Sequence, residues 1–192
     1  MNRLRKSVEL ALLGLLATIV SGCHIRSDED VAAERTFREN LGNTAVTVFP
    51  ASLRDGKGGR HHDAAANELA NFLNAEKLAT AEASAAHIPL SGSASYSQTK
   101  IYSASIREFR AWLRDHPITA DYAVLPEYLL DGQDRPIGVH AYVLNRDGAE
   151  AFGIILNSHH PSYKTIKPQK IDDATRVLIE GLRAELKKSE GK

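Results

Sequence analysis

Hydrophobic and polar residues follow strand-like and helix-like spacings in turn along the chain. Residues 44–50 (TAVTVFP) are almost continuously apolar and β-branched, as in a strand buried on both faces. Residues 64–79 carry apolar positions at helical spacing, and Asp63 is placed to cap that helix. We expect the glycine-rich, basic residues 51–62 to form the loop between them. The first packed unit is therefore strand, loop and helix.

A helix and a strand come next, after a stretch with little periodicity. Residues 80–84 allow a short strand, whereas residues 85–104 are rich in alanine and serine and give no indication of whether they are ordered. Ser105 begins a Ser-x-x-Glu capping box, and apolar residues follow at helical spacing. Residues 122–130 then predict a strand in which Pro126 marks an edge or a bulge.

Residues 137–157 predict an antiparallel hairpin. If Leu144 pairs with Ala149, the larger apolar side chains share the helix-covered face of the hairpin. The other face then carries His140 opposite Gly153, which leaves open space beside the histidine ring. A slip of one residue would exchange the two faces.

The chain closes with a helix from about Asp172 to Lys187 that has an apolar stripe. Together these elements predict a single mixed α/β domain over residues 44–188, followed by a frayed tail at 189–192. We expect a sheet of four or five strands with a late antiparallel hairpin, and three main helices packed mainly on one face.

The first 23 residues follow a different pattern. Arg3, Arg5 and Lys6 precede an apolar segment, residues 10–20, that is shorter than the ~20 residues a membrane-spanning helix needs. Val20-Ser21-Gly22-Cys23 then resembles the lipobox of a bacterial lipoprotein. An ordinary secretory signal is the alternative, but Cys23 is the chain's single cysteine and stands where a lipobox requires it.

This resemblance implies a cleaved signal peptide, residues 1–22, and a lipid (palmitate) anchor on Cys23. Residues 23–43 are then a lipidated tether. His24 stands where an aspartate commonly signals retention at the inner membrane, so the resemblance implies the outer membrane, with the domain facing the periplasm.

Composition and missing motifs argue against several classes of function. Basic and acidic residues balance at 24 each, which argues against a nucleic-acid partner. An acylated Cys23 leaves no thiol for a disulfide, so the domain must be held together by packing alone. The Gly-rich segment after the first strand lacks the P-loop pattern, and there is no Gly-x-Ser-x-Gly. We therefore predict no nucleotide site and no serine nucleophile.

Histidine is the one enrichment that suggests chemistry. Two adjacent pairs fall in loops near the ends of predicted strands, and a fifth histidine lies on the hairpin. Zinc binds histidine and carboxylate ligands, so these residues could form a metal site if the loops meet. The alternative is that they hydrogen-bond the backbone as ordinary loop and cap residues. The candidate ligands are His61, His62, His140, His159 and His160.

The element order over roughly residues 44–186, with the Phe49-Pro50 end of the first strand, resembles the CsgG and TolB amino-terminal class of envelope lipoprotein domains. No site motif of that class is matched, so no functional residue carries over. We expect a non-enzymatic accessory or assembly protein, without a cofactor, that binds other envelope proteins or itself. The alternative is a metal-dependent enzyme, such as a hydrolase, that uses zinc at the loop histidines.

Overall fold

The computed structural model describes residues 27–56, 58–91 and 97–187. The lipobox at residues 20–23 and the tail at 189–192 lie outside the described residues. Within the described part, the strands are β1 Ala45–Val48, β2 Ala51–Arg54, β3 Arg60–His62, β4 Thr80–Ala83, β5 Tyr122–Leu130, β6 Pro136–Asn145 and β7 Glu150–Asn157. The helices are α2 Asp28–Glu39, α3 Ala64–Ala75, α4 Gln98–Asp115, α5 Pro161–Ile166 and α6 Ile171–Lys187.

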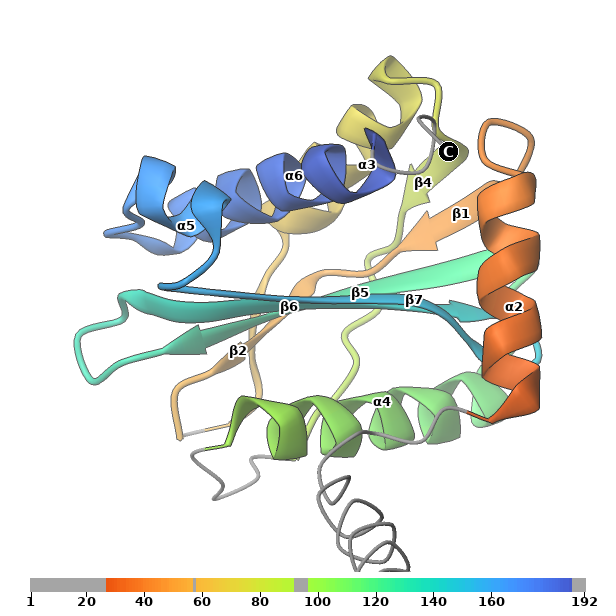
Figure 1. The fold of residues 1–192 in the computed structure, drawn as a ribbon. Coiled ribbons are helices and arrows are strands. Elements are labelled where there is room, and N and C mark those ends of the chain that lie inside the picture. The colour runs from red at the N-terminus through yellow and green to blue at the C-terminus, as the bar shows by residue number, and fades with distance from the viewer. Residues whose placement is uncertain (1–26, 57, 92–96, 188–192) are drawn as a thin grey trace, which may run out of the picture.

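The sheet lies between two helical layers (Figure 1). Helices α3, α5 and α6 cover one face, and α4 lies along the other. Helix α2 runs across one end of the sheet and packs against β7. Most helices therefore share a face, as expected, but the opposite face is covered as well.

The seven strands form one mixed sheet around β5. On one side β5 pairs antiparallel with β6, which continues into β7. On the other side it pairs in parallel with β1 near its start and with β2 near its end. β4 and β3 border these two short strands. The mixed α/β class and the late hairpin are confirmed. There are seven strands rather than four or five, because residues 51–62 add β2 and β3.

Pro50 separates β1 from β2, and Pro126 of the neighbouring strand β5 lies opposite this break. Pro126 lies in the central strand, so our expectation of an edge or a bulge at this residue was wrong. The N–H of Phe49 donates to the oxygen of Val124 over 2.9 Å, on the β1 side of β5. Backbone groups two residues apart point to the same side, so Pro126 faces the break at Pro50, where no ladder donor is needed.

Residues 51–62 form strands rather than the expected loop. β2 and β3 pair antiparallel, and Gly56, Gly58 and Gly59 near the turn adopt φ angles of +80°, +71° and +72°. Ala51 and Leu53 are buried on one side of β2. The glycines and basic residues of the turn obscured this short alternating pattern.

The helix starts differ from the predicted ones for local reasons. α4 begins at Gln98, so Ser105 is an interior residue, and its hydroxyl donates to Glu127 instead of capping the helix. Asp63 occupies the N-cap position of α3 without a side-chain cap bond. Its backbone is helical instead of extended, and its carboxylate contacts His87 at 2.7 Å. At the start of α6, Asp173 rather than Asp172 accepts from the backbone of the preceding loop.

Helix α2 belongs to the packed domain. We had assigned its residues to the tether, but Ala33 and Phe37 are buried, and the Phe37 ring lies 4.9 Å from that of Tyr122. A capping box formed by Ser27 and Asp30 begins the helix. The packed domain therefore includes residues 27–43, which precede the expected start at residue 44.

Each face of the sheet has its own hydrophobic core. The main core lies between the sheet and helices α2, α3 and α6, and includes Phe37, Leu69, Tyr128 and Leu178. The α4 core lies on the opposite face, where Phe109 of α4 and Ile88 of the preceding segment meet Leu125. The faces of the hairpin were predicted correctly, so His140 and Tyr142 lie in the α4 core.

Candidate functional site

The hairpin register differs from the expected one by two residues, which keeps the faces but changes the neighbours of His140. His140 pairs with Ile155, and Tyr142 pairs with Gly153. A Cβ on Gly153 would overlap the hydroxyl of Tyr102, which reaches over from α4. The open space that we expected beside His140 is therefore absent, because α4 fills it.

The histidines of β3 bond to different neighbours. The Nε2 atom of His61 lies 3.1 Å from the oxygen of Ile88, and its ring stacks on that of His87 at 4.3 Å. His62 Nε2 lies 3.4 Å from a carboxylate oxygen of Asp172 at the start of α6. The two rings therefore serve separate contacts.

The second pair lies at the start of α5. His160 is the N-cap, and its Nδ1 atom accepts from the N–H of Ser162 over 3.2 Å. The N–H of His159 donates to the side chain of Asn157. No three His, Cys, Asp or Glu side chains in the described residues are grouped so that they could hold a metal ion. The metal site stays a prediction that this arrangement does not support.

The strongest concentration of chemically capable groups is a buried cluster under α4, which we call the Glu127 cluster. It comprises Arg54, Ser105, Glu127, His140 and Tyr142. Glu127 comes from the middle of β5 and, like His140, is fully buried. Arg54 reaches it from the end of β2, and Ser105 reaches it from α4. Side chains from β2, β6 and α4 thus gather around the carboxylate that β5 supplies.

The Glu127 carboxylate is saturated with donors. Arg54 Nε donates to Oε1 over 2.7 Å, and Arg54 Nη2 lies 2.6 Å from the same oxygen. The Ser105 hydroxyl lies 3.1 and 3.0 Å from the two oxygens, and the Tyr142 hydroxyl donates to Oε2. Arg54 also donates to Ser105 and to the backbone oxygen of Ser91. This is the full pairing that a buried charge requires.

These contacts determine the proton positions. Burial acts to raise the pKa of Glu127, but His140, the positive charge of Arg54 and the Tyr142 hydroxyl together hold it below its ordinary value. Burial and the neighbouring Glu127 charge raise the pKa of Tyr142 far above its usual range. The single hydroxyl hydrogen of Tyr142 is donated to Glu127. In the 3.1 Å contact between His140 Nδ1 and the Tyr142 oxygen, the histidine is therefore the donor.

A second set of hydrogen bonds, centred on the buried carboxylate of Asp30, connects α2 to α4 and β7. Asp30 Oδ1 accepts from the N–H of Glu150 over 2.6 Å and from Arg110 of α4 over 3.1 Å. The Tyr102 hydroxyl donates to Glu150 over 2.7 Å. Burial acts to raise the pKa of Asp30, but the donors of Glu150, Ser27 and Arg110 lower it overall. We call these groups the Asp30 clamp, since they hold α2, α4 and β7 together.

The Glu127 cluster has the chemistry of a catalytic site but not the access. The ring of Tyr102 closes over His140 at 5.9 Å between centroids. The gap beside Arg54 and Glu127, bordered by Gly56, Gly58 and Leu90, holds about 10 Å³. That volume is roughly one water molecule at most. As arranged, the cluster anchors α4 to the sheet.

An open polar groove lies elsewhere, at the end of α2. It holds about 380 Å³, in the range of ligand-binding clefts. Asp121 pairs with Arg146 there, and the N–H of Ala45 lowers the pKa of Asp121 despite partial burial. The buried hydroxyl of Thr44 has no hydrogen-bond partner among the described residues. The groove is lined by Thr36, Asn40, Asn43, Thr44, Asp121, Tyr122, Asn145, Arg146 and Asp147.

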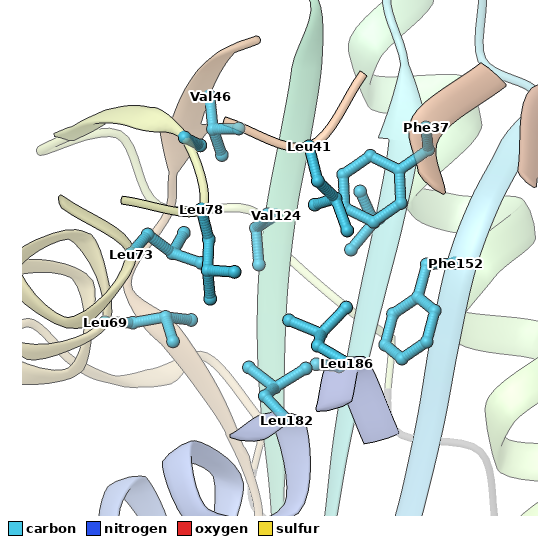
Figure 2. Close-up of a pocket in the computed structure, with 13 residues that line it drawn as sticks. Phe37, Leu41, Val46, Leu69, Leu73, Leu78, Val124, Phe152, Leu182 and Leu186 are labelled. Carbon is cyan, nitrogen blue, oxygen red and sulfur yellow. The ribbon is translucent and has the colours of Figure 1, made fainter. Parts of the chain in front are cut away.

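The main core contains an apolar pocket (Figure 2). Phe37 and Leu41 approach it from α2 and the following turn, Leu69 from α3, and Leu182 from α6. Its volume is about 30 Å³, far below the ~300–1,000 Å³ of ligand-binding clefts, and its lining is apolar. We interpret it as a packing gap rather than a ligand site.

Sequence reasoning missed both the Glu127 cluster and the groove. A single glutamate inside an apolar strand and a serine on a helix's buried face were the available signals for the cluster. The groove gave none, because its residues come from α2, the connection from α2 to β1, the start of β5 and the β6–β7 turn. They are brought together only by the fold.

Comparisons with known proteins leave the family open. No protein-family model matches the chain, and no curated protein matches it. Among solved structures, the LpoB C-terminal domain from Salmonella enterica matches with a TM-score of 0.37 and 11% identity. The match covers 68% of this chain and 97% of that domain. At this TM-score the two folds overlap only in part, and the resemblance to the CsgG and TolB class stays a prediction.

No helix among the described residues combines the length and apolar character needed to cross a membrane.

Proposed function

We propose that this protein is a lipid-anchored lipoprotein of the bacterial envelope that binds a partner protein and catalyses no reaction. The anchor is the lipid on Cys23, and the binding site is the polar groove at the end of α2. The outer membrane, with the domain in the periplasm, is the proposed location.

One observation carries the binding role. The groups capable of proton transfer, Glu127, His140 and Tyr142, are enclosed and bonded to one another. The open groove is instead lined by amides, hydroxyls and a paired carboxylate. Such groups can exchange hydrogen bonds with a polar peptide surface, as the polar rim of a protein–protein interface does.

The anchor is supported by the sequence. A basic start, a short apolar segment and Val20-Ser21-Gly22-Cys23 supply what acylation requires. Several acyl chains on one residue would hold the domain durably, because each buried methylene contributes about 0.8 kcal/mol.

Site-specific photo-crosslinking in living Gram-negative cells tests both parts. A photoreactive residue at exposed Asn43, in the groove, should give one discrete adduct with an envelope protein or a second copy. The same residue at exposed Lys164, on α5, should give none. Thr36→Arg, which obstructs the groove, should abolish the adduct, whereas the matched exposed Thr165→Arg should not.

Labelled palmitate should enter the wild-type chain and be lost in Cys23→Ala. Absence of palmitate would refute the anchor. An adduct that survives Thr36→Arg, or equal adducts at both positions, would refute the groove as the binding site.

A further inference from the structure

The outward-facing line of α4 is basic. Lys100, Arg107 and Arg114 are exposed and follow one another at seven-residue spacing, which places them on one face of the helix. None of the three has an ion pair among the described residues. We call this line the basic crest.

The crest gives α4 a charge that the whole chain lacks. Besides the crest, the helix contains Arg110 and two acids, Glu108 and Asp115, while the full chain is formally neutral. Arg110 is paired with Asp30, and the Glu108 carboxylate accepts from Ser91. The positive charge that remains toward solvent is therefore mainly that of the crest, flanked by Asp115 at its end.

The crest lies close to the point where the anchor enters the domain. Arg110 Nη2 is 3.1 Å from Asp30, in the first turn of α2, and Figure 1 shows that end of α2 beside α4. Cys23 precedes the N-cap Ser27 by four residues, so the two Cα atoms are at most about 15 Å apart. Exposed Asp28 and Glu29 also lie at this end, and Arg26 precedes them.

We propose that the basic crest of α4 rests on the anionic headgroups of the leaflet that holds the lipid on Cys23. This inference depends on the proposed anchor. The short connection keeps α4 within reach of the headgroups, and its charge complements theirs. The attraction is electrostatic and is screened by salt. With α4 toward the membrane, α2 rises from the surface and carries the groove at its far end.

Thiol accessibility in vesicles tests the orientation. Acylation consumes the chain's single cysteine, so a cysteine introduced into the full-length lipidated protein is the one free thiol. Ala111→Cys places it beside the crest, and Ala184→Cys places it on exposed α6 across the sheet. An uncharged maleimide polymer then labels protein inserted into vesicles of phosphatidylcholine alone or with one-third phosphatidylglycerol.

We expect the anionic vesicles to slow labelling of the Ala111→Cys variant at least threefold and to leave the Ala184→Cys variant unchanged. Half-molar salt should restore the rate. Adding Arg107→Glu and Arg114→Glu should remove the slowing, whereas the matched pair Lys164→Glu and Lys170→Glu on the opposite side should keep it.

Equal labelling of the Ala111→Cys variant in both vesicles, or slowing that survives reversal of the crest, would overturn the inference. Vesicle flotation separates the two proposals. Protein that fails to float with either vesicle refutes the anchor, whereas protein that floats but labels equally refutes only the orientation.

Discussion

The two faces of the sheet are covered by helices in different ways. On the main face, α3 and α6 contribute almost purely apolar side chains, and the packing leaves a pocket of about 30 Å³. On the α4 face, apolar residues surround a fully paired carboxylate at Glu127. Apolar packing tolerates small gaps at modest cost, whereas a buried charge tolerates no missing partner. The two faces should therefore respond differently to mutation, pH and added volume.

The largest loss of stability is expected on the α4 face. Glu127→Ala leaves Arg54 and Tyr142 buried without their acceptor, and breaking a buried ion pair costs about 3–5 kcal/mol. Urea unfolding monitored by circular dichroism measures the loss. The matched change at exposed Glu68 should stay within about 0.5 kcal/mol. A cost below 1 kcal/mol for Glu127→Ala would show that the cluster does not hold α4.

A somewhat smaller loss is expected on the main face. Leu69→Ala enlarges the existing pocket, and substitutions of this kind cost about 3 kcal/mol. Because no charge is involved, the loss should be the same at pH 5 and pH 7 in urea titrations. A loss that varies with pH would indicate that the main face also depends on titrating groups.

Lowering the pH should weaken the α4 face through protonation of Glu127. The folded-state pKa of Glu127 is lowered, so its contribution to stability is present above the unfolded pKa of about 4.3 and is lost as pH falls through the folded value. Stability curves between pH 3 and pH 7 should fall more steeply in wild type than in Glu127→Gln. Parallel curves would mean that Glu127 does not supply this dependence.

Gly153 and Gly181 allow a matched comparison of how closely the two faces are packed. A Cβ at Gly153 meets Tyr102 and, at 2.9 Å, Glu150, whereas one at Gly181 meets the end of the Leu156 side chain at 2.5 Å. Gly153→Ala should cost about 1–3 kcal/mol by overpacking a bonded group. Gly181→Ala should cost less, because Leu156 can rotate and alanine favours the helix by about 1 kcal/mol. Thermal unfolding of both variants shows whether this order holds.

The smallest effect is a gain. Val46→Ile adds one methylene beside the pocket in the main core, which should stabilise the protein by up to about 0.8 kcal/mol. Val48, two residues further along β1, is fully buried and does not line the pocket. The same change there should destabilise. If both variants lose stability in urea, the pocket is not available to a larger side chain.

Features recorded by local sequence patterns could be predicted, whereas features that depend on contacts between distant segments could not. Helix α6 and the faces of the hairpin could be read from sequence, because apolar periodicity records which side is buried. The interruption at Pro50 and the partners of Glu127 could not, since both depend on contacts between distant segments. Ser105 resembled a cap because the capping motif is local, whereas its true partner is 22 residues away in the chain.

The candidate site was less predictable than the fold. The histidines drew attention by composition, yet the structure distributes them among separate backbone and side-chain contacts. The groove is built from polar residues that resemble any solvated surface until α2 and the β6–β7 turn are placed beside one another.

The Asp30 clamp has a mechanical consequence. The N-cap of helix α2, Ser27, lies four residues after the proposed anchor, and the first turn of the helix is bonded directly to β7 and to Arg110 of α4. Tension transmitted from the bilayer would therefore enter both layers of the domain together instead of peeling α2 away. If the proposed partner binds in the groove, a load that it applies would pass through the same short connection to the membrane, and the domain would then couple the two stiffly.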